Sequence, residues 1–124
     1  MIFGVGTDII EVARMEKMAA RGRQYLESIF TEKERDYCDR RARKSEHYAA
    51  RYAAKEALLK ALGTGWRNGL AFSDIEIIND ELGQPRVSLH GEVKKIFDQH
   101  QIRQTSISLS HTDEIAIAVV VLEK

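Results

Sequence analysis

The chain has 124 residues, enough for one domain with its own core and too few for two. Apolar residues make up 44% and charged residues 31%, a balance that is typical of soluble globular proteins and argues against extended disorder. The longest apolar run, residues 115–122, is too short to span a bilayer. With no signal-peptide pattern and a single cysteine, which excludes an internal disulfide, a reduced cytoplasmic protein is expected.

The net charge of zero hides an uneven distribution of charge along the chain. Residues 1–70 carry 14 Lys and Arg against 10 Asp and Glu, whereas residues 71–124 carry 5 against 9. The basic excess is densest over residues 40–60, and such a patch favours an anionic partner: a nucleic acid, a phosphorylated small molecule or an acidic protein. An ordinary solvated helix face is the alternative.

The start of the chain is predicted to be a strand followed by a helix. Residues 2–5 form a short apolar run that ends at Gly6, which indicates a strand and a tight turn. Asp8 and Glu11 have the spacing of a capping box, so a helix is expected over residues 9–20.

Two further helices are predicted in the first half of the chain. Thr31 and Glu34 form a second capping box, which begins a short helix. The longest helix is expected over residues 45–62, with Gly63 as its C-terminal cap. Apolar residues and alanines point in nearly every direction around it, so it is expected to be central and packed on several sides.

Three charged residues on this long helix need an explanation. Lys55 points between apolar neighbours, where a charge is costly unless it is paired or bound. Glu56 and Lys60 lie one turn apart and could form an ion pair, worth only about 0.3–0.5 kcal/mol if exposed.

The second half of the chain is richer in strands. A helix is expected over residues 92–99, and strands over residues 72–79, 86–90, 105–110 and 115–122. Another element or a second copy of the chain could pack on one face of the last hairpin, where the side chains are small: Ser106, Ser108, Ser110, Ala116 and Ala118. The whole predicts a single α+β domain over residues 1–124, with a small antiparallel sheet and a long central helix.

Asp8 and Glu56 are the candidate metal ligands. Asp8 follows a strand at a Gly-x-Gly turn, and Glu56 lies in the middle of a helix in apolar surroundings. Such hard oxygen ligands suit Mg²⁺, which takes one or two carboxylates together with water and substrate phosphates. Considered alone, Asp8 also fits a helix N-cap, and Glu56 fits a pair with Lys60.

The end of the long helix has the chemistry of a phosphate site. Lys60 is a point charge suited to phosphate, and the N–H groups of residues 63–65 could form an anion nest. The glycines there could equally cap the helix, and the order of residues is not that of a Walker A loop. His111, at the end of a predicted strand, could donate to a phosphate or be an ordinary hairpin residue.

Five segments of the chain resemble, in order, the motifs of the holo-acyl-carrier-protein synthases, which are 4′-phosphopantetheinyl transferases. They are GVGTDIIE at residues 4–11, ARYAAKEA with KALGTG at 50–65, DIEI at 74–77, GQP at 83–85 and SLSH at 108–111. No segment is specific alone, and their common order over the whole chain makes the resemblance specific. Tyr52 stands where phenylalanine is common, a conservative difference.

The resemblance implies an enzyme that moves 4′-phosphopantetheine from coenzyme A to a serine of apo acyl carrier protein, in support of fatty acid biosynthesis. Adenosine 3′,5′-bisphosphate would be released. The resemblance also implies dependence on Mg²⁺, a homotrimer with active sites at the subunit interfaces, and an α+β fold. Neither a nucleic acid nor a membrane is an expected partner.

The resemblance assigns roles to individual residues. Asp8 and Glu56 would hold the metal, Lys60 would stabilise charge on the phosphate, and Glu56 is the candidate base for the serine hydroxyl. Coenzyme A would be held by a wider group: Arg51, Lys60, Gly63, Thr64, Gly65 and His111. The acidic recognition helix of the carrier protein could meet two arginines that are expected on one face of the first helix: Arg14 and Arg21.

Three other interpretations stay open at this point. A non-catalytic nucleic-acid-binding domain would use the basic run, although no nucleic-acid-binding motif is present. A structural oligomer would use the same carboxylates and lysines as plain ion pairs. A transferase of this type could also serve a polyketide or peptide carrier domain.

Overall fold

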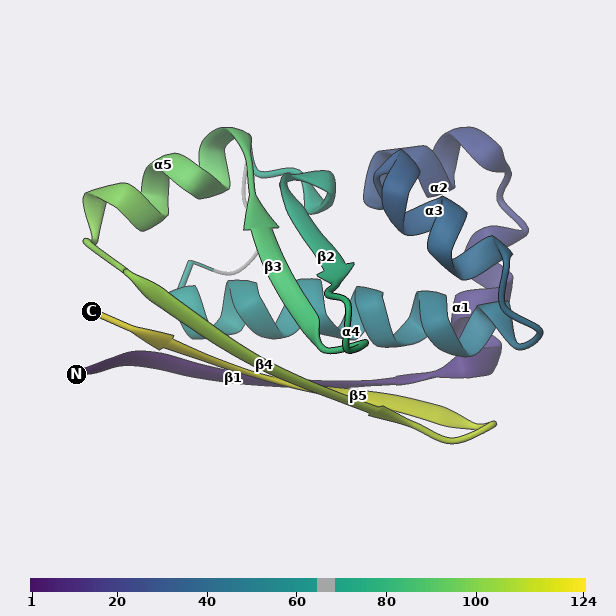
Figure 1. Cartoon of the computed structure of the whole chain (residues 1–124). Coiled ribbons are helices and arrows are strands. Elements are labelled where there is room, and N and C mark those ends of the chain that lie inside the picture. The colour runs from purple at the N-terminus through teal and green to yellow at the C-terminus, as the bar shows by residue number, and fades with distance from the viewer. Residues whose placement is uncertain (65–68) are drawn as a thin grey trace.

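The computed structural model describes residues 1–64 and 69–124 and has an α+β architecture (Figure 1). Its elements follow the chain in this order: β1 (Ile2–Glu11), α1 (Val12–Ala19), α2 (Arg23–Ile29), α3 (Glu32–Asp39), α4 (Lys44–Leu62), the short 3-10 helix η1 (Phe72–Asp74), β2 (Ile75–Asn79), β3 (Pro85–Leu89), α5 (Gly91–Gln99), β4 (Gln104–His111) and β5 (Ile115–Glu123).

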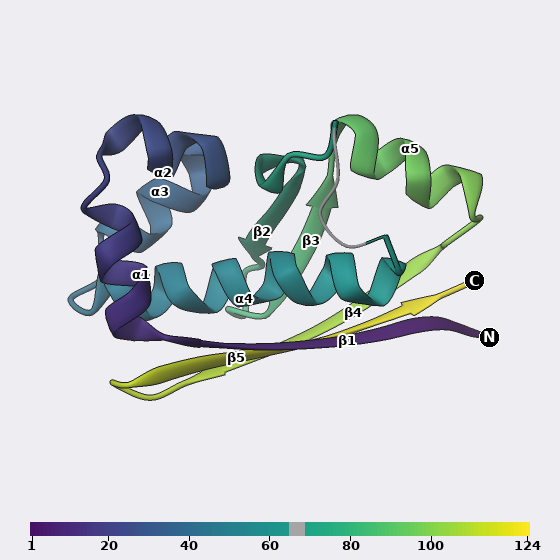
Figure 2. The ribbon, with the colours of Figure 1, turned by 180° about the vertical axis from the view of Figure 1, so that it is seen from behind.

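The long helix α4 lies between a three-stranded sheet and the remaining elements (Figure 1; Figure 2). The three-stranded sheet is antiparallel with the strand order β1-β5-β4, and β2 and β3 form a separate antiparallel pair. The two ends of the chain meet, and the Lys124 N–H donates to the Met1 carbonyl oxygen at 2.9 Å. The expected α+β class is confirmed, and none of the described helices is long and apolar enough to cross a membrane.

The helix α4 is buried on nearly all sides, as its sequence predicts. It runs over 19 residues and ends at Gly63, whose φ of 83° lies in the left-handed region that glycine favours. The strand β1 approaches it closely. A Cβ on Gly6 would lie 1.8 Å from the carbonyl oxygen of Ala57, and one on Gly4 would lie 1.9 Å from that of Ala61. Only glycine fits at this contact between the two backbones.

The faces of the large sheet differ from the predicted arrangement. The three serines of β4 pair with branched residues of β5: Ser106 with Val121, Ser108 with Val119 and Ser110 with Ile117. Ala116 and Ala118 point to the other face, which packs on α4, and both are fully buried. Directly paired residues of antiparallel strands point to the same side, so the prediction that these serines and alanines share one face is wrong.

The first helix begins later than predicted. β1 continues to Glu11, which pairs with Ile115 of β5, and α1 begins only at Val12 without a side-chain cap. Asp8 therefore lies inside a strand, and the predicted capping box with Glu11 is wrong. Pairing with β5 satisfies the backbone groups that a cap would have satisfied, so the tertiary structure overrides the local signal. The helix α2 was not predicted from the sequence.

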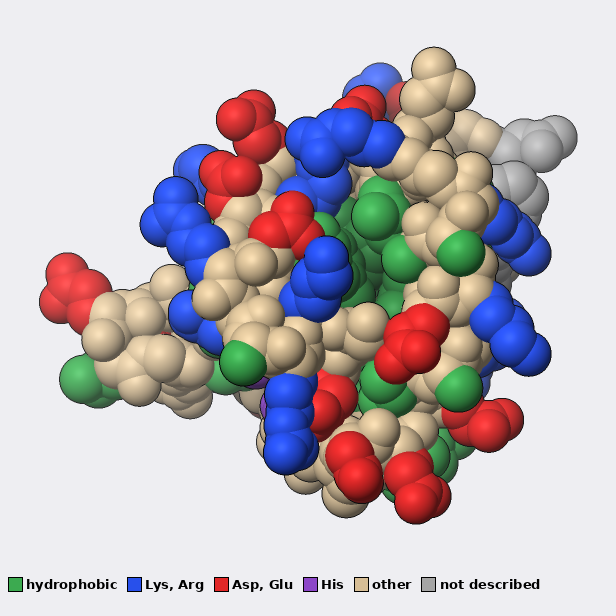
Figure 3. Space-filling model, turned by 90° about the vertical axis from the view of Figure 1, so that its right-hand side faces the viewer, with side chains coloured by type: hydrophobic (Ala, Val, Ile, Leu, Met, Phe, Trp, Pro, Cys, Tyr) green, Lys and Arg blue, Asp and Glu red, His purple; other side chains and the backbone are tan. Residues whose placement is uncertain are grey.

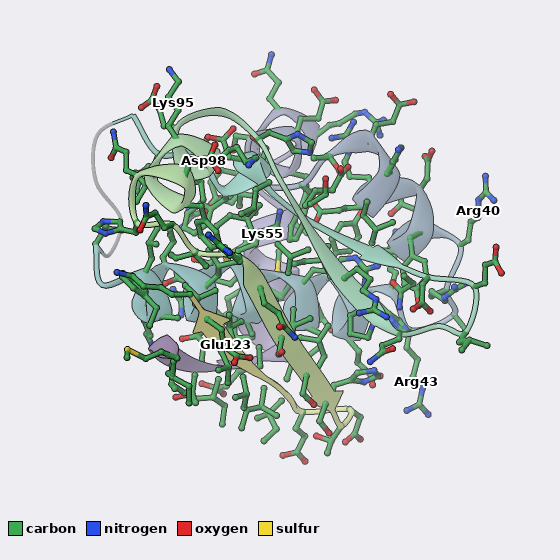
Figure 4. The ribbon with its side chains drawn as sticks, turned by 60° about the vertical axis from the view of Figure 1, so that its left-hand side comes forward. Arg40, Arg43, Lys55, Lys95, Asp98 and Glu123 are labelled. Atoms are coloured by element: carbon green, nitrogen blue, oxygen red, sulfur yellow. The ribbon has the colours of Figure 1, made fainter. Side chains whose placement is uncertain are left out.

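The second capping box is confirmed at the start of α3. The Glu34 N–H donates to the Thr31 hydroxyl, and the Thr31 N–H donates to Glu34 Oε1 at 2.9 Å. The same Oε1 accepts from Lys55 Nζ at 2.8 Å, and both side chains are fully buried. Lys55 also donates to the carbonyl oxygens of Phe72 and Ile75. The buried charge on α4 therefore has a complete set of partners, and Lys55 lies in the middle of the molecule (Figure 4).

Candidate functional site

Asp8 and Lys60 meet where β1 crosses α4. Asp8 lies on the inner face of β1, opposite Ala118 of β5, and its side chain is mostly buried. Lys60 Nζ donates to Asp8 Oδ1 and to the carbonyl oxygen of Thr7, both at 3.0 Å. Lys60 thus pairs with Asp8, and the alternative pair between Lys60 and Glu56 does not form.

Glu56 lies one turn before Lys60 on α4, and its side chain is half-buried. Its Oε1 accepts a hydrogen bond from the Tyr52 hydroxyl at 3.1 Å. Burial raises the pKa of Tyr52 to about 12, with a further contribution from the Glu56 carboxylate, so the phenol keeps its proton at neutral pH and acts as the donor. This bond uses one carboxylate oxygen, and the second can bind a cation.

The carboxylates of Asp8 and Glu56 are of the ligand type that Mg²⁺ prefers. Asp8 and Glu56 supply carboxylate oxygens. Lys60, which contacts Asp8 and lies one turn after Glu56, carries a positive charge that can pair with a phosphate. Mg²⁺ commonly binds one or two carboxylates and completes its shell with water and substrate phosphates. Among the described residues there is no group of three or more His, Cys, Asp or Glu that could enclose a metal. Two carboxylates are enough to hold a Mg²⁺ ion whose remaining ligands come from water and the substrate.

Arg51 forms part of a second cluster on another side of α4. With His111, Tyr37, Asn79 and residues 83–85 it lines a cavity of about 340 Å³. Arg51 is only 3% exposed, its guanidinium lies 4.0 Å from the centre of the Tyr37 ring, and its Nη2 donates to Asn79. Its Nε finds no acceptor within the described parts of the chain. A buried guanidinium with an unused donor is suited to a phosphate group.

His111 is the last residue of β4, at the strand end where the sequence predicts it. Its Nδ1 lies 3.0 Å from Glu46 Oε1, and its ring centre lies 5.1 Å from that of His47. Burial lowers the pKa of His47, and the neighbouring His111 and Arg41 lower it further. His47 is therefore neutral at neutral pH and adds hydrogen-bonding capacity to the cavity without a fixed charge.

The basic run over residues 40–60 does not form one surface. Arg40 and Arg43 are exposed and extend away from the molecule (Figure 4). Arg51 and Lys55 are buried, the first beside the cavity and the second in the core. The basic residues of this run therefore have three different environments: the exposed surface, a buried ion pair in the core and a candidate phosphate site. The alternative that the run forms a single solvated helix face is wrong.

One chain does not bring all the predicted site residues together. Arg51 and Lys60 are nine positions apart on α4, which places them about 180° apart around the helix. The sheet repeats this separation, because Asp8 lies on the edge strand β1 and His111 on the opposite edge strand β4. We call the first group, Asp8, Glu56 and Lys60, the carboxylate half-site and the second, Arg51 and His111, the cavity half-site.

The predicted nest of N–H groups after α4 is only partly within the described chain. Gly63 caps α4 with its left-handed conformation, and Thr64 follows it. Gly65 lies outside the described residues. The capping role of Gly63 is therefore confirmed, and the phosphate-binding role of residues 63–65 stays a prediction.

The two arginines predicted to meet a carrier protein do not share a helix. Arg14 is exposed on α1, whereas Arg21 lies in the turn beyond the end of that helix, so the prediction of a single helix face is wrong. The Arg21 guanidinium lies 4.8 Å from the centre of the Tyr25 ring. Tyr25 lines an apolar cleft of about 350 Å³ with Tyr52 and Phe72. The side of the molecule that carries α1, α2 and α3 has a hollow of hydrophobic side chains bordered by charged ones (Figure 3).

Two features of the site were not predicted from the sequence. The bond between Tyr52 and Glu56 joins residues four positions apart on a helix, a spacing that could have revealed it. The pair of Lys55 with Glu34 joins two helices and leaves no periodic signal, only the need of a buried lysine for some partner.

Comparison with known proteins gives consistent matches over the whole chain. A profile of the 4′-phosphopantetheinyl transferase superfamily matches residues 4–120. A holo-[acyl-carrier-protein] synthase of Geobacter sulfurreducens is 46% identical over 100% of this chain and 99% of its own length. The crystal structure of a holo-[acyl-carrier-protein] synthase from Neisseria meningitidis matches with a TM-score of 0.91 at 34% identity, over 100% of both chains. That of the Helicobacter pylori synthase in complex with coenzyme A matches with a TM-score of 0.84 at 35% identity, over 96% of this chain and 99% of the other. The present chain belongs to the 4′-phosphopantetheinyl transferase superfamily.

Proposed function

We propose that this transferase moves 4′-phosphopantetheine from coenzyme A to a serine hydroxyl of apo acyl carrier protein and releases adenosine 3′,5′-bisphosphate. The observation that carries the proposal is the meeting of Asp8 with Lys60 at the contact of β1 and α4, one turn from Glu56. It lies within a chain that matches holo-[acyl-carrier-protein] synthases over its full length. The single cysteine, Cys38, is free and buried, which fits the reducing conditions of the cytoplasm.

The carboxylate half-site is suited to the diphosphate of coenzyme A. Asp8 and Glu56 would hold Mg²⁺, which neutralises diphosphate charge when bound. Lys60 neutralises Asp8 in the free protein, and its side chain is 54% exposed, so it can turn toward a phosphate oxygen that gains charge during transfer. These residues bind and orient the diphosphate, and most of their effect is electrostatic.

The chemical step exchanges one phosphorus–oxygen bond for another. The serine oxygen bonds to the phosphorus that carries pantetheine, and the bond from this phosphorus to the adenosine bisphosphate oxygen breaks. The serine must lose a proton, and Glu56 would accept it, directly or through a water molecule. The leaving group departs as a phosphate and needs no proton from the enzyme at neutral pH.

The nucleotide end of coenzyme A would lie in the cavity half-site of another subunit. Arg51 and His111 offer donors to a phosphate there, but they lie on the opposite side of α4 from the carboxylate half-site. A subunit interface that joins edge strand β1 of one copy to edge strand β4 of the next would complete the site. We propose that three copies close such a ring, so that each site is built from two subunits.

The outer face of the large sheet supports burial against other copies. It carries exposed branched side chains on its two neighbouring strands β1 and β5: Val5, Ile9, Ile115 and Ile117. Val5 is 56% and Ile9 59% exposed. Contiguous apolar surface of this kind is uncommon on monomers and typical of interfaces.

The carrier protein would dock on the side that carries α1 and α2. Arg14 and Arg21 are exposed there, beside the apolar cleft that Tyr25 lines. An acidic helix with a few apolar side chains is complementary to such a surface, because the arginines attract the acidic groups and the cleft can bury the apolar ones. Arg14→Glu is therefore expected to weaken use of the carrier far more than binding of coenzyme A.

Intact-mass spectrometry of the carrier protein tests the function directly. The protein is incubated with coenzyme A, Mg²⁺ and purified apo acyl carrier protein, with EDTA as the control. We expect a gain of one phosphopantetheine group that EDTA abolishes, and its loss in Asp8→Ala and Glu56→Ala variants that stay folded. Full activity of both variants would contradict the metal assignment. A parallel arm with polyketide and peptide carrier domains defines the acceptor range.

A further inference from the structure

We propose that the Tyr52 hydroxyl is a positioning group for Glu56, and this inference rests on the function proposed above. The hydroxyl donates to Glu56 Oε1 at 3.1 Å from one turn earlier on α4. A glutamate side chain turns about several bonds, and an exposed one samples many orientations. A hydrogen bond to one carboxylate oxygen fixes the direction of the other, which is the oxygen left to bind a cation or accept a proton.

Tyr52 is held by the core of the protein. It is 8% exposed, and its ring packs on the ring of Phe72, with centres 5.6 Å apart. The Phe72 carbonyl oxygen accepts a hydrogen bond from Lys55 Nζ at 3.0 Å, and Lys55 is fully buried. Lys55 also directly precedes Glu56 in the chain. One core contact therefore anchors both the backbone beside Glu56 and the aromatic pair that orients its side chain.

A comparison with a second tyrosine on α4 separates this role from a purely structural one. The Tyr48 hydroxyl donates to Asp39 Oδ1 at 2.8 Å, and that bond ties α4 to the end of α3. The bond of Tyr52 joins two residues of the same helix and connects no separate elements. Its main effect therefore falls on the conformation of the Glu56 side chain, whereas that of Tyr48 falls on the packing of helices.

The experiment compares Tyr52→Phe with Tyr48→Phe, which loses a hydroxyl–carboxylate bond of the same kind one turn away. Binding of Mn²⁺, as the probe for the divalent site, is measured by electron paramagnetic resonance with coenzyme A present and no carrier protein. Rates of transfer to the carrier are measured with Mg²⁺. In Tyr52→Phe we expect about 10-fold weaker binding of Mn²⁺ and a lower kcat, with KM for coenzyme A unchanged. In Tyr48→Phe we expect a lower melting temperature and neither of these changes.

A double variant tests whether Tyr52 acts through Glu56. In a Glu56→Ala background, which removes the acceptor of this hydrogen bond, removal of the Tyr52 hydroxyl should leave the remaining Mn²⁺ affinity unchanged. The positioning role is overturned if Tyr52→Phe binds Mn²⁺ within about twofold of the unaltered protein, or if its effect is equally large in the Glu56→Ala background. If the unaltered protein binds Mn²⁺ but modifies no carrier, the proposed transfer fails while the metal titration still decides the role of Tyr52. Absence of any Mn²⁺ binding overturns the metal assignment and with it the role of Tyr52, whereas the transfer rates still decide the proposed function.

Discussion

Lys55 is a charged side chain with no access to water, and its charge can stay buried only because hydrogen-bonding partners surround it. Its ammonium group has three N–H donors, and the structure supplies three acceptors: Glu34 Oε1 and the carbonyl oxygens of Phe72 and Ile75. Glu34 in turn accepts from the Ile77 N–H at 2.9 Å. Burial lowers the pKa of Lys55, and the Glu34 carboxylate acts in the opposite direction. This arrangement ties α3, α4, η1 and β2 together at the residue that precedes Glu56 on α4.

Removal of the Lys55 charge should therefore lower the free energy of unfolding substantially. In Lys55→Met the Glu34 carboxylate stays buried without its cation, and loss of one partner of a buried pair costs about 3–5 kcal/mol. Urea unfolding measures the loss. Lys94→Met is the matched control, because Lys94 pairs with Asp98 on the surface of α5 at 2.7 Å and such pairs contribute only a few tenths of a kcal/mol. A loss of less than about 1 kcal/mol in Lys55→Met would show that the core adapts to an unpaired Glu34.

At the scale of elements, local signals in the sequence succeed where no distant strand competes with them. Thr31 and Glu34 begin α3 with the predicted capping box, and α4 ends at Gly63 as predicted. Asp8 and Glu11 have the same spacing as Thr31 and Glu34, but β5 pairs with them from the other end of the chain, and β1 extends through them.

In the candidate site, too, local features could be predicted from the sequence and contacts between distant elements could not. The chemistry of Asp8, Glu56 and Lys60 is readable from residue type and motif, and the structure brings Asp8 and Lys60 into contact. Which lysine pairs with which carboxylate is not readable, because Lys55 and Lys60 both find partners on other elements. Periodicity places side chains around one helix and says nothing of what packs against it.

The contact of β1 with α4 sets the position of Asp8, and Gly6, two residues before Asp8, is one of the two glycines that permit it. In Gly6→Ala the new Cβ would lie 1.8 Å from the Ala57 carbonyl oxygen, so β1 must move away from α4 and carry Asp8 with it. We expect a loss of about 1–3 kcal/mol, as for other overpacked sites, and a larger relative loss of transfer activity. Thr7→Ala is the control, because this side chain lies on the exposed outer face and its carbonyl oxygen, which Lys60 contacts, is kept. Unfolding curves and carrier mass measure the two effects, and equal activity of both variants would contradict the prediction.

At the scale of the whole molecule, the two half-sites and the exposed sheet face call for the same arrangement. Asp8 and His111 lie on opposite edges of one sheet, with Ile9 and Ile117 exposed on the outer face between them. A monomer would leave this apolar face in water and keep the proposed diphosphate ligands away from the cavity of Arg51. In the proposed closed ring of identical copies, each contact would join one edge to the other and bring the two half-sites together, and the outer face would be available for burial against neighbouring copies.

Mixing of two inactive variants tests this arrangement. Asp8→Ala damages the carboxylate half-site and His111→Ala the cavity half-site, so each variant alone should transfer little. If every site combines the carboxylate half-site of one subunit with the cavity half-site of its neighbour, unfolding and refolding an equal mixture gives about a quarter of the sites both intact halves. Carrier mass spectrometry should then show about a quarter of the activity of the unaltered protein, and light scattering should give the mass of a trimer. The matched control mixes Asp8→Ala with Glu56→Ala, which damage the same half-site and should not rescue each other. Equal activity of the two mixtures, or a monomeric mass, would place the whole site within one chain.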